Sequence, residues 1–271
     1  MDTDALKERR DPPAAELEPK PPSPAIEVEH LTVSYGPKPA LLDASVSIAR
    51  GHLVGIIGPN GAGKSTFIKA VLGFIPVDFG IVRVLGIPAS EARGKVAYVP
   101  QRGSVDWDFP ITVKDVVLMG RYGKLPFWRD PGREDWMAVR EALETVRMAE
   151  FIDRQIGQLS GGQQQRVFMA RALAQAGDVL LLDEPFAGVD AATESALLDV
   201  LRRAREQGRT LVVVHHDLAT AGEYFDRLLL LKQRVVAYGT PEQVLREDLL
   251  CEVYEGTLKI FRSLQPKEAG A

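Results

Sequence analysis

The sequence contains a single cysteine, Cys251, among its 271 residues. One cysteine cannot form a disulfide within the chain, and it fits a reducing compartment. No run of apolar residues approaches the ~18 that a membrane-spanning helix needs, and the longest runs, such as residues 228–231, have the length of buried strands. The charged, proline-rich N-terminus lacks the apolar segment of a signal peptide. We therefore expect this protein to reach a membrane only by docking onto another protein that spans it.

An excess of positive charge is also missing. The chain has 33 Lys and Arg against 37 Asp and Glu, which gives a formal net charge of -4 at pH 7. This balance argues against a nucleic-acid partner bound over a broad basic surface, but it is compatible with a local basic site for phosphates. The hydrophobic content of 45% and the charged content of 26% are those of an ordinary globular protein. A chain of 271 residues can form one large domain, or a core with a subdomain.

The first 25 residues are rich in proline and charge and poor in large apolar side chains. Such a segment buries too little apolar surface to offset the entropy of ordering it, so we predict a disordered tail over residues 1–25. Folded sequence is predicted to begin at Ile26. Apolar residues within 26–33, and alternating polar and apolar residues over 44–48, indicate strands of a small antiparallel sheet.

An α/β core is predicted from buried-strand patterns that alternate with helical patterns. Residues 53–57 and 179–182 are apolar throughout, as expected for strands of a parallel sheet that is covered on both faces. Residues 102 to about 160 show amphipathic helical periodicity, and we predict a helical subdomain inserted into the core there. The main domain is predicted to span residues 26–250, which leaves 251–271 as a C-terminal extension.

A glycine-rich turn follows the first buried strand and opens a helix. It reads GPNGAGKST over residues 58–66, which matches the phosphate-loop pattern in the strand-turn-helix context that this pattern requires. Glycines let backbone N–H groups curl around anionic oxygens, and the helix start adds its positive dipole end. We predict that Lys64 contacts the β- and γ-phosphates of ATP and that Ser65 binds Mg²⁺. The predicted ATP-binding residues of the loop are Gly58, Pro59, Asn60, Gly61, Ala62, Gly63, Lys64, Ser65 and Thr66.

Two carboxylates follow the buried strand at residues 179–182. Asp183 ends this strand, and ligands of open α/β sheets bind at the carboxyl ends of strands. We predict that Asp183 holds Mg²⁺ and that Glu184 acts as the general base or positions the attacking water. An acidic pair on the surface is the alternative, but it leaves the four preceding apolar residues unexplained.

A further motif, LSGGQ, occupies residues 159–163. With the phosphate loop before it and the acidic pair after it, the chain resembles the ABC ATPase family over roughly residues 26–250. The resemblance implies an ABC-type P-loop NTPase fold with a mainly parallel sheet, a small antiparallel β subdomain and an inserted helical subdomain. It also implies that two copies sandwich ATP, so that the phosphate loop of one copy faces the signature residues of the other, which are Leu159, Ser160, Gly161, Gly162 and Gln163.

Four further residues are similar to functional residues of that family. Gln101 resembles the glutamine that senses Mg²⁺ and the attacking water, close to where the transmembrane partner docks. His216 resembles the switch histidine that contacts the γ-phosphate; His215 is the alternative, but the family places an aspartate directly after the switch residue. Asp190 resembles the D-loop aspartate, although the residues around it differ slightly from the usual family sequence. Tyr35 resembles the aromatic residue that stacks on adenine, with a core tyrosine as the alternative.

The sequence between the phosphate loop and the signature narrows the resemblance. Residues 101–113, residues 117–122 and the double histidine before Asp217 are similar to the ATPases of bacterial manganese, zinc and iron importers. Such an ATPase receives its permease in this region, so these residues reflect the shape of the partner more than ATP chemistry. Packing of Trp107 and Phe109 within the helical subdomain is the alternative explanation for part of the stretch. Manganese is the first prediction for the cargo.

The resemblance implies an ATP-hydrolysing importer subunit that uses ATP and Mg²⁺. Its implied partners are a second copy of itself, integral membrane permease subunits and, indirectly, an extracytoplasmic metal-binding protein, which places it on the cytoplasmic face of the membrane. The four histidines and single cysteine do not make a transition-metal site, so Mg²⁺ is the only metal expected in this chain. The alternatives are an importer ATPase for haem, siderophore or cobalamin, and a soluble ABC ATPase of the iron–sulfur assembly type.

Overall fold

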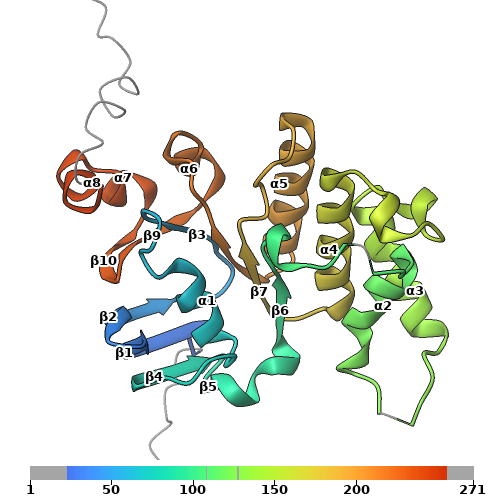
Figure 1. Cartoon of the computed structure of the whole chain (residues 1–271), viewed down its shortest axis with the longest axis horizontal. Helices are drawn as coiled ribbons and strands as arrows, with labels where there is room; N and C mark the ends of the chain where they lie inside the picture. Colours follow the sequence, from blue (N-terminus) through green and yellow to red (C-terminus); the bar gives the residue numbers. More distant parts are fainter. Residues whose placement is uncertain (1–22, 108, 127, 255–271) are drawn as a thin grey trace, which may run out of the picture.

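Two β-sheets organise the molecule (Figure 1). The larger has six strands in the order β10-β9-β3-β8-β7-β6, and the smaller has four in the order β2-β1-β4-β5. The computed structural model describes residues 23–107, 109–126 and 128–254. Most of the predicted N-terminal tail (1–25) and of the predicted C-terminal extension (251–271) lies outside these ranges.

The larger sheet is parallel apart from one edge strand. Strand β10 pairs antiparallel with β9, whereas β9, β3, β8, β7 and β6 run parallel to their neighbours. Every residue of β3, β7 and β8 is buried, and the side chains of β3 alternate between two hydrophobic cores, one on each face. The prediction of a sheet covered on both faces is confirmed. In chain order the strands are β3 (Leu53–Ile57), β6 (Val96–Val99), β7 (Val179–Asp183), β8 (Thr210–Val214), β9 (Arg227–Lys232) and β10 (Arg234–Gly239).

The smaller sheet is antiparallel and lies with helix α1 on one face of the larger sheet (Figure 1). Phe67 and Ile68 of α1 belong to the same core as Leu31 of the small sheet and Ile56 of β3. The predicted antiparallel sheet is confirmed, but two of its four strands, β4 and β5, carry no sequence signal that we recognised. The elements are β1 (Ile26–Tyr35), β2 (Lys38–Ile48), β4 (Phe79–Val84), β5 (Ile87–Pro88) and α1 (Lys64–Val71).

Helices form the rest of the molecule. Helices α5 and α6 pack against β3, while α2, α3 and α4 pack against one another and reach the sheet where α4 contacts β6. Short 3-10 turns connect several elements: η1 (Ala89–Glu91), η2 (Arg93–Lys95), η3 (Arg102–Ser104), η4 (Ala149–Phe151) and η5 (Ile156–Gln158). The remaining α-helices are α2 (Val113–Tyr122), α3 (Arg133–Thr145), α4 (Gly161–Gln175), α5 (Ala191–Glu206), α6 (Leu218–Tyr224), α7 (Pro241–Val244) and α8 (Glu247–Val253).

One arginine joins helices α2, α3 and α4, which lie on the right of Figure 1. Arg121 of α2 donates from Nε to Asp135 Oδ1 of α3 at 2.9 Å and from Nη1 to the backbone oxygen of Ala174 in α4 at 3.1 Å. A planar guanidinium with several donors suits such a junction. Helices α2 and α3 lie within residues 102–160, where the sequence predicts an inserted helical subdomain, whereas α4 follows that range. Within the described ranges, no helix is both long and apolar enough to cross a membrane.

Candidate functional site

The glycine-rich loop connects β3 to α1 in a conformation that two of its glycines make feasible. Gly58 and Gly63 have φ values of 150° and 92°. A Cβ atom on Gly58 would lie 2.1 Å from the backbone oxygen of Leu231, and one on Gly63 would lie 2.5 Å from that of Ala40. A side chain fits at neither position. The loop is therefore shaped by its contacts with β9 and β2 as well as by its own sequence.

Lys64 begins α1, and only 8% of its surface is exposed. Its Nζ donates to the backbone oxygens of Gly58 at 2.7 Å and Pro59 at 2.9 Å, both within the loop. Burial lowers the pKa of Lys64, while the charges of Glu184 and Asp183 act in the opposite direction. The ammonium group is thus held inside the loop, where it can donate to an anion that the loop encloses.

Ser65 and Asp183 come together from opposite halves of the chain. Ser65 Oγ donates to Asp183 Oδ1 at 3.3 Å, and Asp183 is 4% exposed at the end of β7. Burial raises the pKa of Asp183, and the bond from Ser65 lowers it. A hydroxyl beside a carboxylate at a phosphate-binding loop offers the hard oxygen ligands that Mg²⁺ takes. The donor set therefore fits the metal that the sequence predicts for these two residues.

Glu184 and Gln101 meet at the same edge of the sheet. Nε2 of Gln101 donates to Oε2 of Glu184 at 2.9 Å. Strands β6 and β7 are parallel neighbours, so the residues that follow them emerge side by side. Glu184 has a φ of 51°, in the left-handed region that non-glycine residues seldom adopt and that is enriched at functional sites.

A cavity of about 290 Å³ opens over the loop. Glu184 lines it together with Lys64 and Ser65, so a carboxylate, an ammonium group and a hydroxyl share one space. Ala40 of β2 also lines it, although the sequence pattern does not point to this residue. Only the folding of the antiparallel sheet against the loop brings Ala40 there. The remaining lining residues are Asn60, Gly61, Ala62, Gly63 and Thr66, all predicted as ATP-binding residues.

The signature residues lie at the start of α4. Ser160 is the N-cap: its Oγ accepts from the Gln163 N–H at 3.4 Å, and Gln163 Oε1 accepts from the Ser160 N–H at 2.9 Å. Gly161 and Gly162 form the first turn of the helix, and Leu159 is buried before it. A helix start with two glycines presents backbone N–H groups to an anion. Among the described residues that line the phosphate-loop cavity, however, none belongs to the signature.

Asp190 caps α5 and links it to the signature helix. Its two carboxylate oxygens accept from the backbone N–H and the Oγ1 of Thr193, both at 2.9 Å. These bonds lower the pKa of Asp190. Thr193 Oγ1 also accepts from Nη2 of Arg166 in α4 at 2.9 Å. The predicted D-loop aspartate is thus part of a connection between α4 and α5 that the sequence does not predict.

The two adjacent histidines have different surroundings. His215 is 2% exposed, its Nε2 lies 2.8 Å from Thr220 Oγ1, and its ring contacts Phe186 and Phe225 with centroids 5.8 and 5.3 Å apart. Burial lowers the pKa of His215 to about 4, so its ring is neutral at pH 7. His216 is exposed at the end of β8. The exposed histidine is the one that the family resemblance favours as the switch residue.

Tyr35 is the last residue of β1 and is 56% exposed. The alternative prediction, that Tyr35 is a core residue, is therefore wrong, and its ring is free to contact a ligand. In the described part of the chain, no three His, Cys, Asp or Glu side chains come together in an arrangement that could hold a metal ion.

Comparison with known proteins identifies the family to which this chain belongs. The family described as ABC transporter matches residues 41–187, from β2 through the phosphate loop and the signature to the residues after Asp183 and Glu184. The chain belongs to the ABC transporter family. Within that family it is an ATP-binding subunit with ATPase activity, as its motifs predict, and its α/β fold is that of an ABC cassette.

Individual ABC proteins are similar over nearly the whole chain. The zinc transport system ATP-binding protein TroB of Treponema pallidum is 54% identical, with 90% of this chain and 91% of TroB covered. The manganese transport system ATP-binding protein MntB of Bacillus subtilis is 50% identical, with 88% and 95% covered. A dimeric ATP-binding cassette solved with ADP and Pi in a post-hydrolysis state is 27% identical, with a TM-score of 0.70 and 80% and 98% covered.

Proposed function

We propose that this ABC ATPase drives import of a divalent metal ion, with manganese as the first candidate cargo. The similarity of the chain to transport-system subunits named for zinc and for manganese, at 54% and 50% identity, supports the metal class. The observation that carries the ATPase chemistry is the meeting of the Ser65–Asp183 and Gln101–Glu184 pairs at the carboxyl edge of one sheet. The proposed location is the cytoplasmic face of the membrane, where the protein binds a permease.

In the proposed mechanism, the phosphate loop binds ATP through its backbone N–H groups and Lys64, and Tyr35 stacks on the adenine. Ser65 and Asp183, together with Gln101, would hold Mg²⁺, which neutralises charge on the phosphates. Glu184 accepts the proton of the water that attacks the γ-phosphate, and Gln101 fixes the orientation of the Glu184 carboxylate through their hydrogen bond. His216, exposed at the end of the neighbouring strand β8, contacts the γ-phosphate from the side of α6.

A second copy of the chain completes the site. We place Leu159, Ser160, Gly161, Gly162 and Gln163 of one copy against the γ-phosphate held by the other, since within one chain these residues do not line the phosphate-loop cavity. A related cassette has been solved as a dimer, which supports this arrangement. Asp190 sits at the N-cap of α5 and is linked to α4 through Thr193 and Arg166, so the proposed D-loop is connected to the signature helix.

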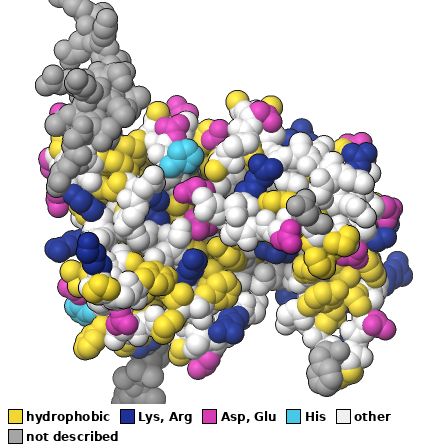
Figure 2. Space-filling view, in the orientation of Figure 1, with side chains coloured by type: hydrophobic (Ala, Val, Ile, Leu, Met, Phe, Trp, Pro, Cys, Tyr) yellow, Lys and Arg dark blue, Asp and Glu magenta, His cyan; other side chains and the backbone are white. Residues whose placement is uncertain are grey.

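A partly apolar groove beside β6, the strand that precedes Gln101, is the proposed docking surface for the permease. A cavity of about 300 Å³ lies between α2, α4 and the segment after α1, and its lining includes exposed Phe74 and Met119 together with Tyr98 of β6. Phe74 and Tyr98 pack edge to face with ring centroids 6.0 Å apart. Figure 2 shows hydrophobic side chains gathered over the part of the surface formed by α2 and α3. An amphipathic helix of a membrane subunit suits such a groove, and β6 connects it to Gln101.

Uptake by intact cells tests the cargo. Cells that lack this chain are compared with cells complemented by the wild type or by Glu184→Gln, using radiolabelled manganese, zinc and iron. We expect manganese uptake to fail in the deletion strain and in the Glu184→Gln strain. Loss of zinc uptake alone, or of iron uptake alone, would identify that metal as the cargo and would leave the proposal of a divalent-metal importer unchanged. Normal uptake of all three metals would overturn the proposal in favour of a haem, siderophore or cobalamin importer, or of a soluble ABC ATPase that does not co-purify with a membrane protein.

A further inference from the structure

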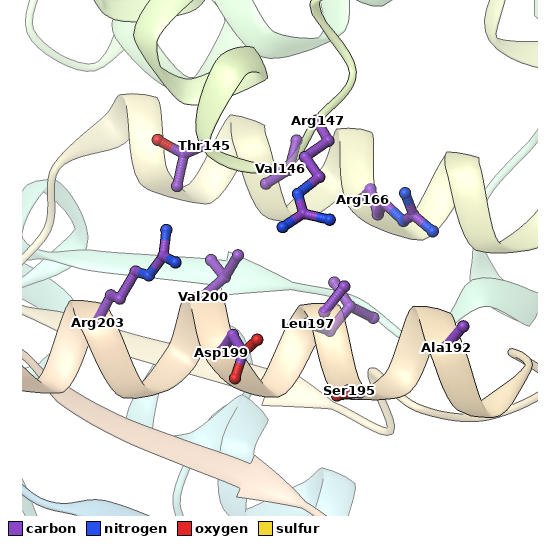
Figure 3. A pocket seen from close by; sticks show the side chains of 11 residues that line it. Thr145, Val146, Arg147, Arg166, Ala192, Ser195, Leu197, Asp199, Val200 and Arg203 are labelled. Atoms are coloured by element: carbon purple, nitrogen blue, oxygen red, sulfur yellow. The ribbon is translucent and has the colours of Figure 1, made fainter.

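A second polar cavity lies between α4, the segment that follows α3, and α5 (Figure 3). Its volume is about 160 Å³, and it shares no lining residue with the phosphate-loop cavity. The volume suits a small ion better than a nucleotide. Neither the ATPase mechanism nor the proposed permease groove uses this cavity.

Three arginines from three segments line this cavity. Arg147 follows α3, Arg166 belongs to α4, and Arg203 belongs to α5. Figure 3 shows Arg147 and Arg203 extending into the gap between the helices. Asp199 is the single carboxylate in the lining, so the cavity has an excess of positive charge. Arg147, Arg203 and Asp199 are exposed and Arg166 is partly buried, so the repulsion between the cations is moderated by solvent, and a bound anion would reduce it further.

The donors of these arginines are largely unused among the described residues. Arg166 makes one hydrogen bond, to Thr193, and its Nε is buried without a partner. Arg147 and Arg203 are exposed to solvent, and the described part of the chain provides neither of them with an ion pair or a side-chain hydrogen bond. Buried polar groups in proteins are nearly always hydrogen-bonded, so the buried Nε of Arg166 points to a ligand, for which the two exposed guanidinium groups are available as further donors.

The backbone of Arg147 is consistent with this interpretation. Arg147 has a φ of 57°, and it follows the last turn of α3, where its N–H donates to the backbone oxygen of Glu144 at 3.0 Å. Helices that end this way usually have glycine at this position. At this position Arg147 carries a long cationic side chain, whereas the usual glycine would carry none.

A further arginine lies beside this cavity, after the end of α5. A neighbouring cavity of about 310 Å³ shares Thr145, Val200 and Arg203 with the first. Arg209 lines this neighbouring cavity, and its Nη1 is also buried without a partner. Glu141 lines the same neighbouring cavity, and the charges of Asp178 and Glu141 act on Arg209, so this second cavity is of mixed charge.

We propose that this arginine cavity binds an oxyanion of the phosphate class, supplied as inorganic phosphate or as the phosphate group of a small phosphate ester. Guanidinium groups form paired hydrogen bonds with such oxygens, and three of them can surround one tetrahedral anion. The anion would bridge the end of α3, the signature helix and α5. Because Arg166 also bonds Thr193, and Thr193 bonds Asp190, occupancy of the cavity would tie the two helices together beside the predicted D-loop. The site goes beyond the proposed import function and does not depend on the cargo.

Calorimetric titration of the full chain tests the site. Inorganic phosphate and glycerol 3-phosphate are titrated separately in the presence of saturating Mg·ADP, so that nucleotide fills the phosphate loop. The double variant Arg147→Gln/Arg203→Gln is compared with the wild type and with Arg140→Gln, an exposed arginine of α3 that does not line the cavity. We expect at least tenfold weaker binding in the double variant and unchanged binding in Arg140→Gln. Preference between the two titrants identifies the source of the phosphate group.

Equal binding by the double variant and the wild type would overturn the proposal, as would absence of binding to the wild type. Titration without nucleotide adds a second check: Lys64→Ala, which removes the phosphate-loop cation, retains the arginine-dependent binding if the cavity is the site. If binding disappears in Lys64→Ala and persists in the double variant, the anion binds only the phosphate loop. Circular dichroism establishes that each variant is folded. The variant Arg203→Lys keeps the positive charge but loses the paired N–H donors of the guanidinium group, so it is expected to bind with intermediate affinity.

Discussion

Gln101 and Glu184 are 83 positions apart in the sequence, yet Nε2 of Gln101 lies 2.9 Å from Oε2 of Glu184. The first residue follows β6 and the second follows β7, and the parallel pairing of these strands brings their ends together. The proposed permease groove includes Val96 and Tyr98 of β6. One strand therefore joins the surface where a partner is proposed to dock to the hydrogen bond on the proposed general base.

Replacing Glu184 with Gln is expected to abolish turnover without abolishing ATP binding. The amide keeps the shape of the side chain but cannot accept a proton, so the ATPase rate should fall by about 10²–10⁴-fold. The variant should also accumulate an ATP-bound dimer, measurable by size-exclusion chromatography with multi-angle light scattering. Glu150→Gln, at an exposed position in η4, is the matched control and should keep the wild-type rate. Hydrolysis at the wild-type rate by Glu184→Gln would show that the catalytic assignment is wrong.

Mixing two inactive variants is expected to restore activity if the site is shared between chains. Ser160→Arg obstructs the signature, and Glu184→Gln removes the general base. In a mixed dimer, one of the two composite sites keeps both Glu184 of the first chain and Ser160 of the second. If the chains pair at random and the sites act independently, up to about a quarter of all sites should be active. The ATPase rate of the mixture, compared with each variant alone, is the measurement.

The wild type gives a complementary result. Its ATPase rate should rise more than linearly with protein concentration in the range where monomer and dimer coexist. A rate that stays proportional to concentration in a sample shown to be monomeric, or no recovery on mixing variants that do form dimers, would contradict the split site.

His215 is expected to make stability depend on pH. Its pKa lies at about 4 in the folded chain and at 6.5 in the reference state, so the unfolded chain takes up the proton first as pH falls. The neutral ring therefore contributes stability that is complete above 6.5 and is lost between 6.5 and about 4, a change of about 3 kcal/mol at most.

Chemical denaturation of the wild type and of His215→Phe at several pH values measures this contribution. Phenylalanine fits the aromatic surroundings formed by Phe186 and Phe225 but does not titrate. The difference in unfolding free energy between the two proteins should therefore change across this range in favour of the variant at low pH. A difference that does not vary with pH would contradict the assignment.

Two glycines of the phosphate loop separate the effect of backbone conformation from that of steric contact. Gly61 and Gly63 both have positive φ, but a Cβ on Gly61 meets nothing within 4 Å, whereas one on Gly63 meets the Ala40 oxygen at 2.5 Å. Gly61→Ala should cost about 1–2 kcal/mol of unfolding free energy for its left-handed conformation. Gly63→Ala should cost more, because the small sheet must move. Equal losses in denaturant titrations would contradict a steric role for Ala40.

Much of the secondary structure follows from local patterns. The residue pattern after Ser160 predicts a helix from about Gly161 to Gln175, and α4 has these bounds. The continuous apolar runs are central strands of the parallel sheet. Helices α6 and α8 were not predicted, since each is only seven residues long and lacks a clear apolar periodicity. Strand β4 depends on pairing with β1, a contact between distant segments that no local pattern reveals, and β5 is a two-residue strand that pairs with β4.

The sequence alone determined the family and the phosphate loop, because both rest on contiguous residues whose backbone and side-chain chemistry is local. The motifs GPNGAGKST and LSGGQ can be recognised from their contiguous residues before the position of either one in the fold is known. Only the tertiary structure decided which of the two histidines is buried, that Ala40 enters the nucleotide cavity, and that Arg147, Arg166 and Arg203 surround another. These arrangements depend on the order of strands in the sheet and on helix packing, which bring together side chains from distant segments and set how much water each one loses.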